Sequence, residues 1–190
     1  MGANLDLALS ALPEADRAPV AVWLTATAAY CAYHYGFVAR PGKALGDVLR
    51  QRLAGLGLLG LVPMLIAWGL GHPPWSVGIA PASLERTLLA VLGLWALSLP
   101  AVAVSSGKAA HRADYPQARL ATWTRHDLLA NAAGWAYLLG YEVLFRGVLL
   151  FPSVERFGVW PALGATTGLY TLAHLPKQAG ETFGCIFMGL

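Results

Sequence analysis

Long apolar runs constrain this chain more than any other feature of its sequence. A helix needs about 20 apolar residues to cross the roughly 30 Å hydrocarbon layer of a bilayer. A chain of 190 residues can bury one apolar core, but it cannot hide several separate runs of this length in water. The runs predict an all-α, polytopic transmembrane bundle with five complete spans, at residues 18–39, 53–71, 87–104, 128–151 and 158–175.

Composition and charge placement support lipid as the solvent. The chain is 57% hydrophobic and 12% charged, whereas soluble domains contain roughly 25% charged residues. The formal net charge of +3 comes from cations in short segments between the apolar runs, not from a basic stripe. We therefore expect the bilayer, and no nucleic acid, as a partner.

The cations between the runs also predict an orientation. The two segments that contain most of them, residues 40–52 and 105–126, are expected on the cytoplasmic side, which places the N-terminus outside. Residues 1–17 contain one cation, Arg17, and so do not resemble a cleaved signal peptide. We expect the first span to remain as an anchor, in a multi-pass protein of a prokaryotic plasma (inner) membrane.

The chain has no internal repeat or soluble insert, so residues 1–190 are interpreted as a single integral membrane domain. Residues 1–127 are N-terminal spans of unknown role. A sixth apolar segment starts near Thr182 and reaches Leu190 before it can cross the bilayer. We therefore expect this chain to be C-terminally incomplete.

Two ionisable residues interrupt the fourth run. Glu142 and Arg146 are four positions apart, so their side chains should meet on one helix face as an ion pair. Each ionisable residue inside a span costs about 2.5–3.5 kcal/mol on insertion scales, and such residues usually face the bundle interior and have a function. The alternative is a structural pair that neutralises itself.

A histidine in the fifth run is the expected partner of Glu142. The loop at residues 152–157 is short enough to make the fourth and fifth helices antiparallel neighbours, which brings His174 towards Glu142. A lone histidine is more often a core residue, but a carboxylate and an imidazole together can hydrolyse an amide. The carboxylate takes a proton from water, and the imidazole orients the water or stabilises the developing charge.

No metal or other cofactor is expected. A catalytic zinc needs three protein ligands, and the chain has no HExxH motif or similar cluster. Each remaining histidine stands apart from other possible ligands: His34 in the first run, and His72, His111 and His126 in loops.

Two short segments carry a resemblance to a known family. Residues 141–147 (YEVLFRG) and 170–176 (YTLAHLP) resemble the EExxxR and FxxxH motifs of the CPBP intramembrane proteases, also called the type II CAAX prenyl protease or Abi family. The resemblance covers residues 128–190, which would be a partial protease core. It implies a glutamate-dependent endopeptidase that cleaves membrane-associated or prenylated proteins. Glu142 matches the second glutamate, Arg146 the positioning arginine and His174 the histidine.

The chain departs from the family pattern at three places. Tyr141 replaces the first glutamate, and a phenol with an ordinary pKa of about 10 is a poor base at neutral pH. Tyr170 stands where phenylalanine is usual. No later His or Asn motif, which the resemblance implies for the oxyanion hole, precedes Leu190.

These departures leave three functions open. The first is an endopeptidase that hydrolyses membrane-associated protein or peptide substrates with water activated between Glu142 and His174. The second is a catalytically inactive membrane scaffold or partner-binding protein of the same fold, which Tyr141 favours. The third is a small transporter in which Glu142 relays protons, although transporters more often have paired repeats.

The predicted orientation can be tested with reporter fusions. Fusions after Gln51 and after Gln117 should both report a cytoplasmic location, because both positions lie in basic segments. Basic segments between spans remain on the cytoplasmic side of the membrane. An external signal from either fusion would contradict this topology.

Overall fold

The computed structural model describes residues 10–38, 45–80, 83–109, 112, 124–175 and 179–189. Helices joined by turns make up this part of the chain, and it contains no strand. The predicted all-α class is therefore confirmed for the described residues. The chain divides into two compact units, one formed by Met1–Ile79 with Ala133–Leu190 and the other by Ala80–Ala132.

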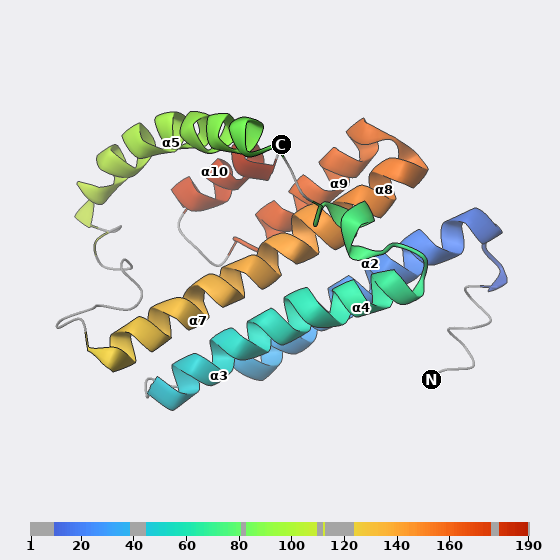
Figure 1. Ribbon diagram of the computed structural model, residues 1–190, viewed down its shortest axis with the longest axis horizontal. Helices are drawn as coiled ribbons and strands as arrows, with labels where there is room; N and C mark the ends of the chain where they lie inside the picture. The colour runs from blue at the N-terminus through green and yellow to red at the C-terminus, as the bar shows by residue number, and fades with distance from the viewer. Residues whose placement is uncertain are drawn as a thin grey trace. The chain divides into compact units, whose positions relative to one another are not determined.

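Several α-helices that lie wholly or mostly in the first unit continue through a π-helical turn without a break (Figure 1). They are α2 (Glu14–Tyr33) with η1 (His34–Val38), α3 (Leu45–Gly55) with η2 (Leu56–Leu61) and α4 (Val62–Gly69), and α7 (Arg125–Glu142) with η4 (Val143–Leu149) and α8 (Leu150–Phe157). The remaining elements of this unit are the 3-10 turn η3 (Pro74–Val77), α9 (Val159–Leu172) and α10 (Ala179–Gly189).

Among the residues that the structure describes, three helices are long and apolar enough to cross a membrane. They are Leu45–Gly69 with 25 residues, Leu84–Ser106 with 23 and Arg125–Phe157 with 33. The helix formed from the first run is long, but its Thr, Tyr and His side chains lower its hydropathy. The fifth run forms α9, which at 14 residues is shorter than the about 20 that a straight crossing needs. Three of the five predicted spans thus meet the length and hydropathy required.

The helices extend into segments that the sequence analysis interpreted as loops. Part of the basic segment 40–52 is helical from Leu45, and the predicted loop at 152–157 belongs to α8. Pro63 and Pro152 follow the π-helical turns η2 and η4. A π-helical turn is locally wider than an α-helical one, which lets the helix continue past a proline that has no backbone N–H to donate. The reversal occurs instead at Gly158, whose φ of 83° is easily adopted only by glycine.

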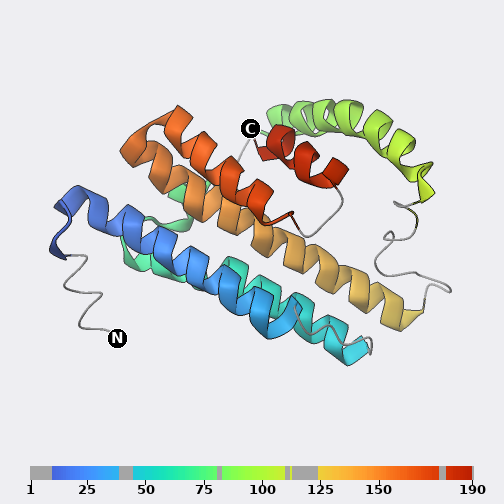
Figure 2. The same cartoon turned by 180° about the vertical axis from the view of Figure 1, so that it is seen from behind.

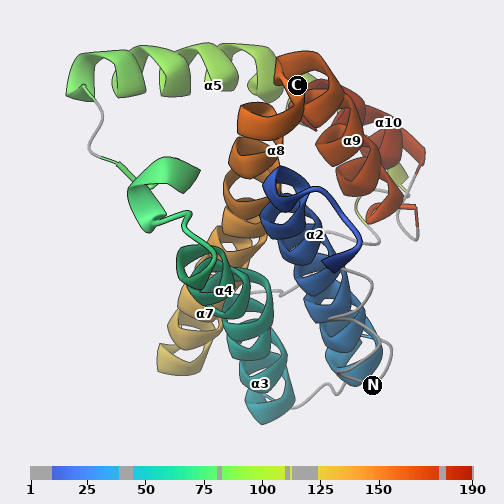
Figure 3. The same cartoon turned by 90° about the vertical axis from the view of Figure 1, so that its right-hand side faces the viewer.

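The first unit is a bundle in which α2, the α3–α4 helix and the α7–α8 helix lie side by side (Figure 2). After Gly158, α9 runs back along α8, and α10 packs against α9 (Figure 3). A buried serine joins α2 to α8, because Trp23 donates its indole N–H to Ser153 Oγ at 2.7 Å. The Ser153 hydroxyl in turn donates to the Leu149 carbonyl, so this buried polar group is satisfied.

Glycines bring two long helices into backbone contact. A Cβ added to Gly60 would lie 2.9 Å from Gly140 Cα, and one added to Gly140 would lie 2.9 Å from Leu56 Cα. In α9, by contrast, a Cβ added to Gly164 or Gly168 would meet no atom within 4 Å. The close crossing therefore lies between η2 and α7, at residues not singled out beforehand.

The second unit contains α5 (Leu84–Ser106). Ser83 caps this helix by accepting from the Arg86 N–H at 3.5 Å. None of the described side chains of α5 is buried, although the helix is apolar on all sides. Such a helix is stable only where lipid or another protein replaces water.

The glycine contact predicts the effect of two substitutions. Gly60→Ala and Gly140→Ala should each destabilise the fold by about 1–3 kcal/mol, because the new methyl overlaps backbone that cannot move aside as a side chain can. Unfolding of the purified protein in mixed micelles would measure this loss. Gly57→Ala is the matched control, because its Cβ meets no atom within 4 Å. Equal stability of all three variants would contradict the contact.

Candidate functional site

The predicted ion pair is present on the long helix. Glu142 is the last residue of α7, and Arg146 lies in η4, the π-helical turn that follows. The Arg146 guanidinium donates to the Glu142 carboxylate, as the four-residue spacing predicted. The side chains remain 42% and 37% exposed in Glu142 and Arg146 respectively, so ligands can reach both. π-Helical turns of this kind are frequent at functional sites.

Tyr170 joins the ion pair to the neighbouring helix. The Arg146 guanidinium carbon lies 5.3 Å from the centre of the Tyr170 ring, which belongs to α9. This cation–π contact stabilises the positive charge of the guanidinium among mainly apolar side chains. Phe145 contacts the same ring edge-on at 5.4 Å. An aromatic side chain at position 170 thus supports the arginine that holds Glu142.

His174 lies in the turn that follows α9, not within a helix as the sequence predicted. Its Nδ1 is 2.9 Å from the Tyr170 carbonyl oxygen, and the two rings are 4.8 Å apart. The turn is held from two sides, because the Tyr30 hydroxyl donates to the Ala173 carbonyl at 3.4 Å and the Thr182 hydroxyl donates to the His174 carbonyl at 2.9 Å. Side chains of α2 and α10 therefore fix the backbone that carries the imidazole.

Tyr141 faces the histidine. Its hydroxyl oxygen lies 3.4 Å from His174 Nδ1, and the two rings meet edge to face at 5.8 Å. Tyr141 is 7% exposed, whereas the adjacent Glu142 points towards Arg146. The residue in place of the expected first glutamate thus contacts the imidazole, and Glu142 is linked to His174 through Arg146 and Tyr170.

An aromatic framework around the site was not singled out from the sequence. Tyr137 stacks on Tyr33 at 5.6 Å, and Tyr137, Tyr141 and Phe145 follow one another along one face of the α7–η4 helix. Their spacing of four residues is a signal that the sequence contained. This spacing places the three rings on one helix face. It does not indicate that the rings packed against them include Tyr33 and Tyr30 of α2.

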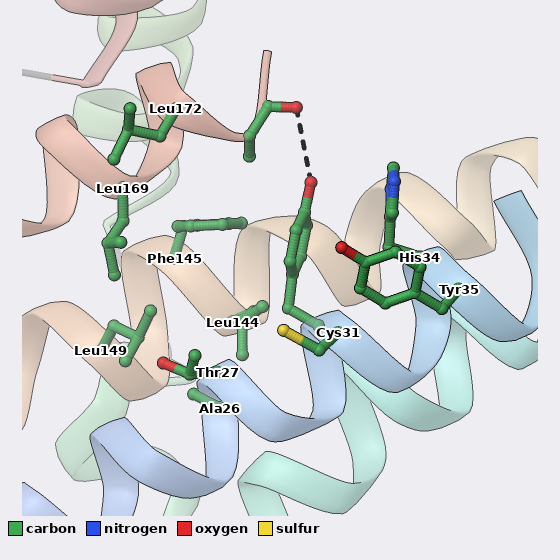
Figure 4. A pocket seen from close by; sticks show the side chains of 12 residues that line it. Ala26, Thr27, Cys31, His34, Tyr35, Leu144, Phe145, Leu149, Leu169 and Leu172 are labelled. Atoms are coloured by element: carbon green, nitrogen blue, oxygen red, sulfur yellow. Dashed lines mark hydrogen bonds between the residues drawn. The ribbon is translucent and has the colours of Figure 1, made fainter. Parts of the chain in front are cut away.

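A small groove opens beside the site, between α2 and the η4 and α9 segments (Figure 4). Its volume is about 270 Å³. The wall is mainly apolar and includes Phe145 and Leu149, while Cys31 and His34 line the α2 side. The Tyr30 hydroxyl donates to the Ala173 carbonyl, and both residues line the groove, next to the turn that holds His174. An apolar chain or side chain of a substrate could lie within reach of that turn.

Over the residues that the structure describes, no three His, Cys, Asp or Glu side chains converge to hold an ion. Among the histidines, His34 stacks on Tyr30, and His72 lies 3.5 Å from Glu155. His111 is outside the described residues.

Comparison of the chain with models of protein families, with curated proteins and with solved structures found no match.

The ion pair can be tested with a double-mutant cycle. Glu142→Gln and Arg146→Met should each lower stability, because each removes one partner of the ion pair and keeps the other charge within an apolar helix, whereas the double variant should recover part of the loss. We expect an interaction energy of about 0.5–3 kcal/mol from unfolding in mixed micelles. Strictly additive losses would show that the two charges do not stabilise each other.

Proposed function

We propose that this chain is a membrane-embedded endopeptidase that hydrolyses peptide bonds of membrane-associated proteins, with water activated between Glu142 and His174. The observation that carries the proposal is one contact cluster that contains both a carboxylate and an imidazole. Glu142 on α7 connects through Arg146 to the Tyr170 ring, and Tyr170 contacts His174. Ionisable groups gathered within apolar helices usually have a function.

The cluster contains the groups that amide hydrolysis needs. A base must take a proton from water as it attacks the carbonyl carbon, and an acid must protonate the departing amine. The imidazole and the carboxylate can supply proton transfer, while the Arg146 guanidinium adds positive charge near the developing oxyanion. The groove beside Ala173 gives an apolar substrate segment a place to lie.

The sequence motifs support the same reaction. Residues 141–147 and 170–176 resemble the first two motifs of the CPBP intramembrane proteases. Their motif residues Arg146, Tyr170 and His174 lie in one contact cluster in this chain. Membership of that family is part of the proposal.

The proposed setting is a prokaryotic plasma membrane. Three helices have the length and hydropathy of spans. We assign the helix Glu14–Val38 and the α9 segment as two further crossings, since each packs against the α7–α8 helix. Two tyrosines that lower the hydropathy of the first helix, Tyr30 and Tyr33, contact aromatic rings of the α7–η4 helix.

A second candidate function is a catalytically inactive scaffold or partner-binding protein with the same fold. Tyr141 favours it, because a phenol occupies the position next to His174 where the resemblance implies a carboxylate. A phenol of ordinary pKa, about 10, does not accept protons from water at neutral pH. The two functions differ in whether substitution of the imidazole abolishes a chemical product or only changes binding.

Proteolysis by the reconstituted chain tests the proposal. The purified protein in liposomes is given a mixed-sequence peptide library whose members carry a fatty acyl anchor, and new peptide ends are identified by mass spectrometry. We expect cleavage by the unaltered chain, a loss of about 10² or more in His174→Ala, and a loss of at least about tenfold in Glu142→Gln.

Matched controls separate chemistry from folding. Glu155→Gln and His72→Ala change the same residue types in a pair outside the contact cluster, and both should cleave at the unaltered rate. Equal cleavage by the His174→Ala protein would contradict the peptidase proposal. Absence of products from the unaltered chain, with native unfolding behaviour, would favour the scaffold instead.

A further inference from the structure

The end of α9 determines the hydrogen bonding of the His174 ring. The last carbonyls of a helix have no partner within the helix and must find one elsewhere. Backbone N–H groups of the turn bond to three such carbonyls, those of Leu169, Thr171 and Leu172. The Tyr170 carbonyl is instead reached by His174 Nδ1, at 2.9 Å.

This contact selects one tautomer of the neutral imidazole. A carbonyl oxygen can only accept, so a hydrogen bond of 2.9 Å requires the proton to be on Nδ1. In the other tautomer two lone pairs would face each other across that distance. The Tyr141 hydroxyl could then donate to Nδ1, but at 3.4 Å it lies beyond the usual range of about 2.7–3.2 Å. The Nδ1–H tautomer therefore satisfies the shorter contact.

From this geometry we infer that His174 Nε2 is the atom that takes the proton from the attacking water. The inference rests on the proposed peptidase function and assigns the proton transfer within it. With the proton on Nδ1, the only basic lone pair of the neutral ring is on Nε2. The Tyr170 carbonyl is thus a positioning group, which fixes both the tautomer and the orientation of the ring.

Glu142 has a different part in this assignment. Its carboxylate is bonded to the Arg146 guanidinium, whose other face covers the Tyr170 ring. The carboxylate keeps this cation in place and balances its charge within the apolar bundle. From the sequence alone we predict that the carboxylate accepts the proton and the imidazole assists, so the roles inferred from the structure are exchanged.

Hydrolysis by this route takes one proton from water and returns it to the leaving amine. The water oxygen forms a bond to the amide carbon as its proton moves to Nε2, which gives an imidazolium and a tetrahedral oxyanion. The imidazolium then returns the proton from Nε2 to the amide nitrogen, and the C–N bond breaks. The products are a carboxylic acid and an amine, and His174 is neutral again with its proton on Nδ1.

The surroundings of the ring suit a transient positive charge. The Tyr170 ring lies 4.8 Å from the imidazole and is tilted by 34°, and the Tyr141 ring lies 5.8 Å away. Aromatic rings stabilise cations at such distances. The Tyr170 carbonyl strengthens its hydrogen bond as the ring becomes charged, because charge-assisted bonds are stronger than neutral ones.

Nitrogen NMR of the full chain tests the tautomer directly. Protein labelled with ¹⁵N-histidine in nanodiscs is measured at a pH of about 8, above the ordinary histidine pKa of about 6.5. The spectrum of His174→Gln identifies the missing resonances. We expect the directly bonded proton on Nδ1 of His174. A proton on Nε2, in all molecules or in exchange, would overturn the inference.

A conservative variant of the facing tyrosine is the control. Tyr141→Phe keeps the ring and removes the hydroxyl. The tautomer should be unchanged in this variant, because the Tyr170 backbone carbonyl determines it. A shift of the proton between the two nitrogens would show that the Tyr141 hydroxyl determines the tautomer, and would also overturn the inference.

The cleavage assay then assigns the base. If His174 takes the proton, the loss of rate in His174→Ala should exceed that in Glu142→Gln at least tenfold, because the glutamine variant loses a counter-charge but keeps the base. Equal losses would show that the carboxylate is needed for the reaction as much as the imidazole, and would overturn the inference while the peptidase function stands. If the unaltered chain cleaves nothing, the proposed function and Nε2's role in it both fail, and the spectrum then decides only the tautomer.

Discussion

A carboxylate and a guanidinium on adjacent turns of an apolar helix can persist there only if they neutralise each other. The Glu142–Arg146 pair does so, and the local structure follows from it. The π-helical turn η4 carries Arg146 towards α9, where the Tyr170 ring covers the guanidinium at 5.3 Å. That contact holds α9 beside the α7–α8 helix, and the turn after α9 places His174 next to the same helix. One charge pair thus connects the helix that contains the acid to the turn that contains the imidazole.

The same arrangement depends on how closely the long helices approach. Gly60 and Gly140 bring η2 and α7 into backbone contact, two positions before Glu142. Larger side chains there would separate these helices and open the aromatic packing of Tyr137 against Tyr33. At the other side of the site, hydroxyls of Tyr30 and Thr182 hold the backbone of the turn. The geometry of the candidate site is therefore supported by elements on three sides of His174.

Tyr141 and Glu142 are adjacent in sequence but make different contacts. The phenol lies against the imidazole, and the carboxylate is committed to the arginine. In the proposed peptidase the remaining base is the histidine, because its Nδ1 is bonded to the Tyr170 carbonyl and its lone pair is on Nε2. In the alternative scaffold the same contacts would be structural. The two functions share one fold and differ in a single proton transfer.

The sequence by itself determined the all-α class, the three helices with the length and hydropathy of membrane spans, and the Glu142–Arg146 pair. Each depends on spacing along one helix, which the order of residues encodes directly. The tertiary structure alone decided that His174 lies in a turn, that Tyr141 faces it, and that the close glycine contact joins Gly60 to Gly140. These features depend on which helix faces meet and on where helices end. The chain reverses at Gly158 and not at residues 152–157, because the π-helical turn accommodates Pro152 and the helix continues past it. No local sequence pattern predicts that position of the reversal.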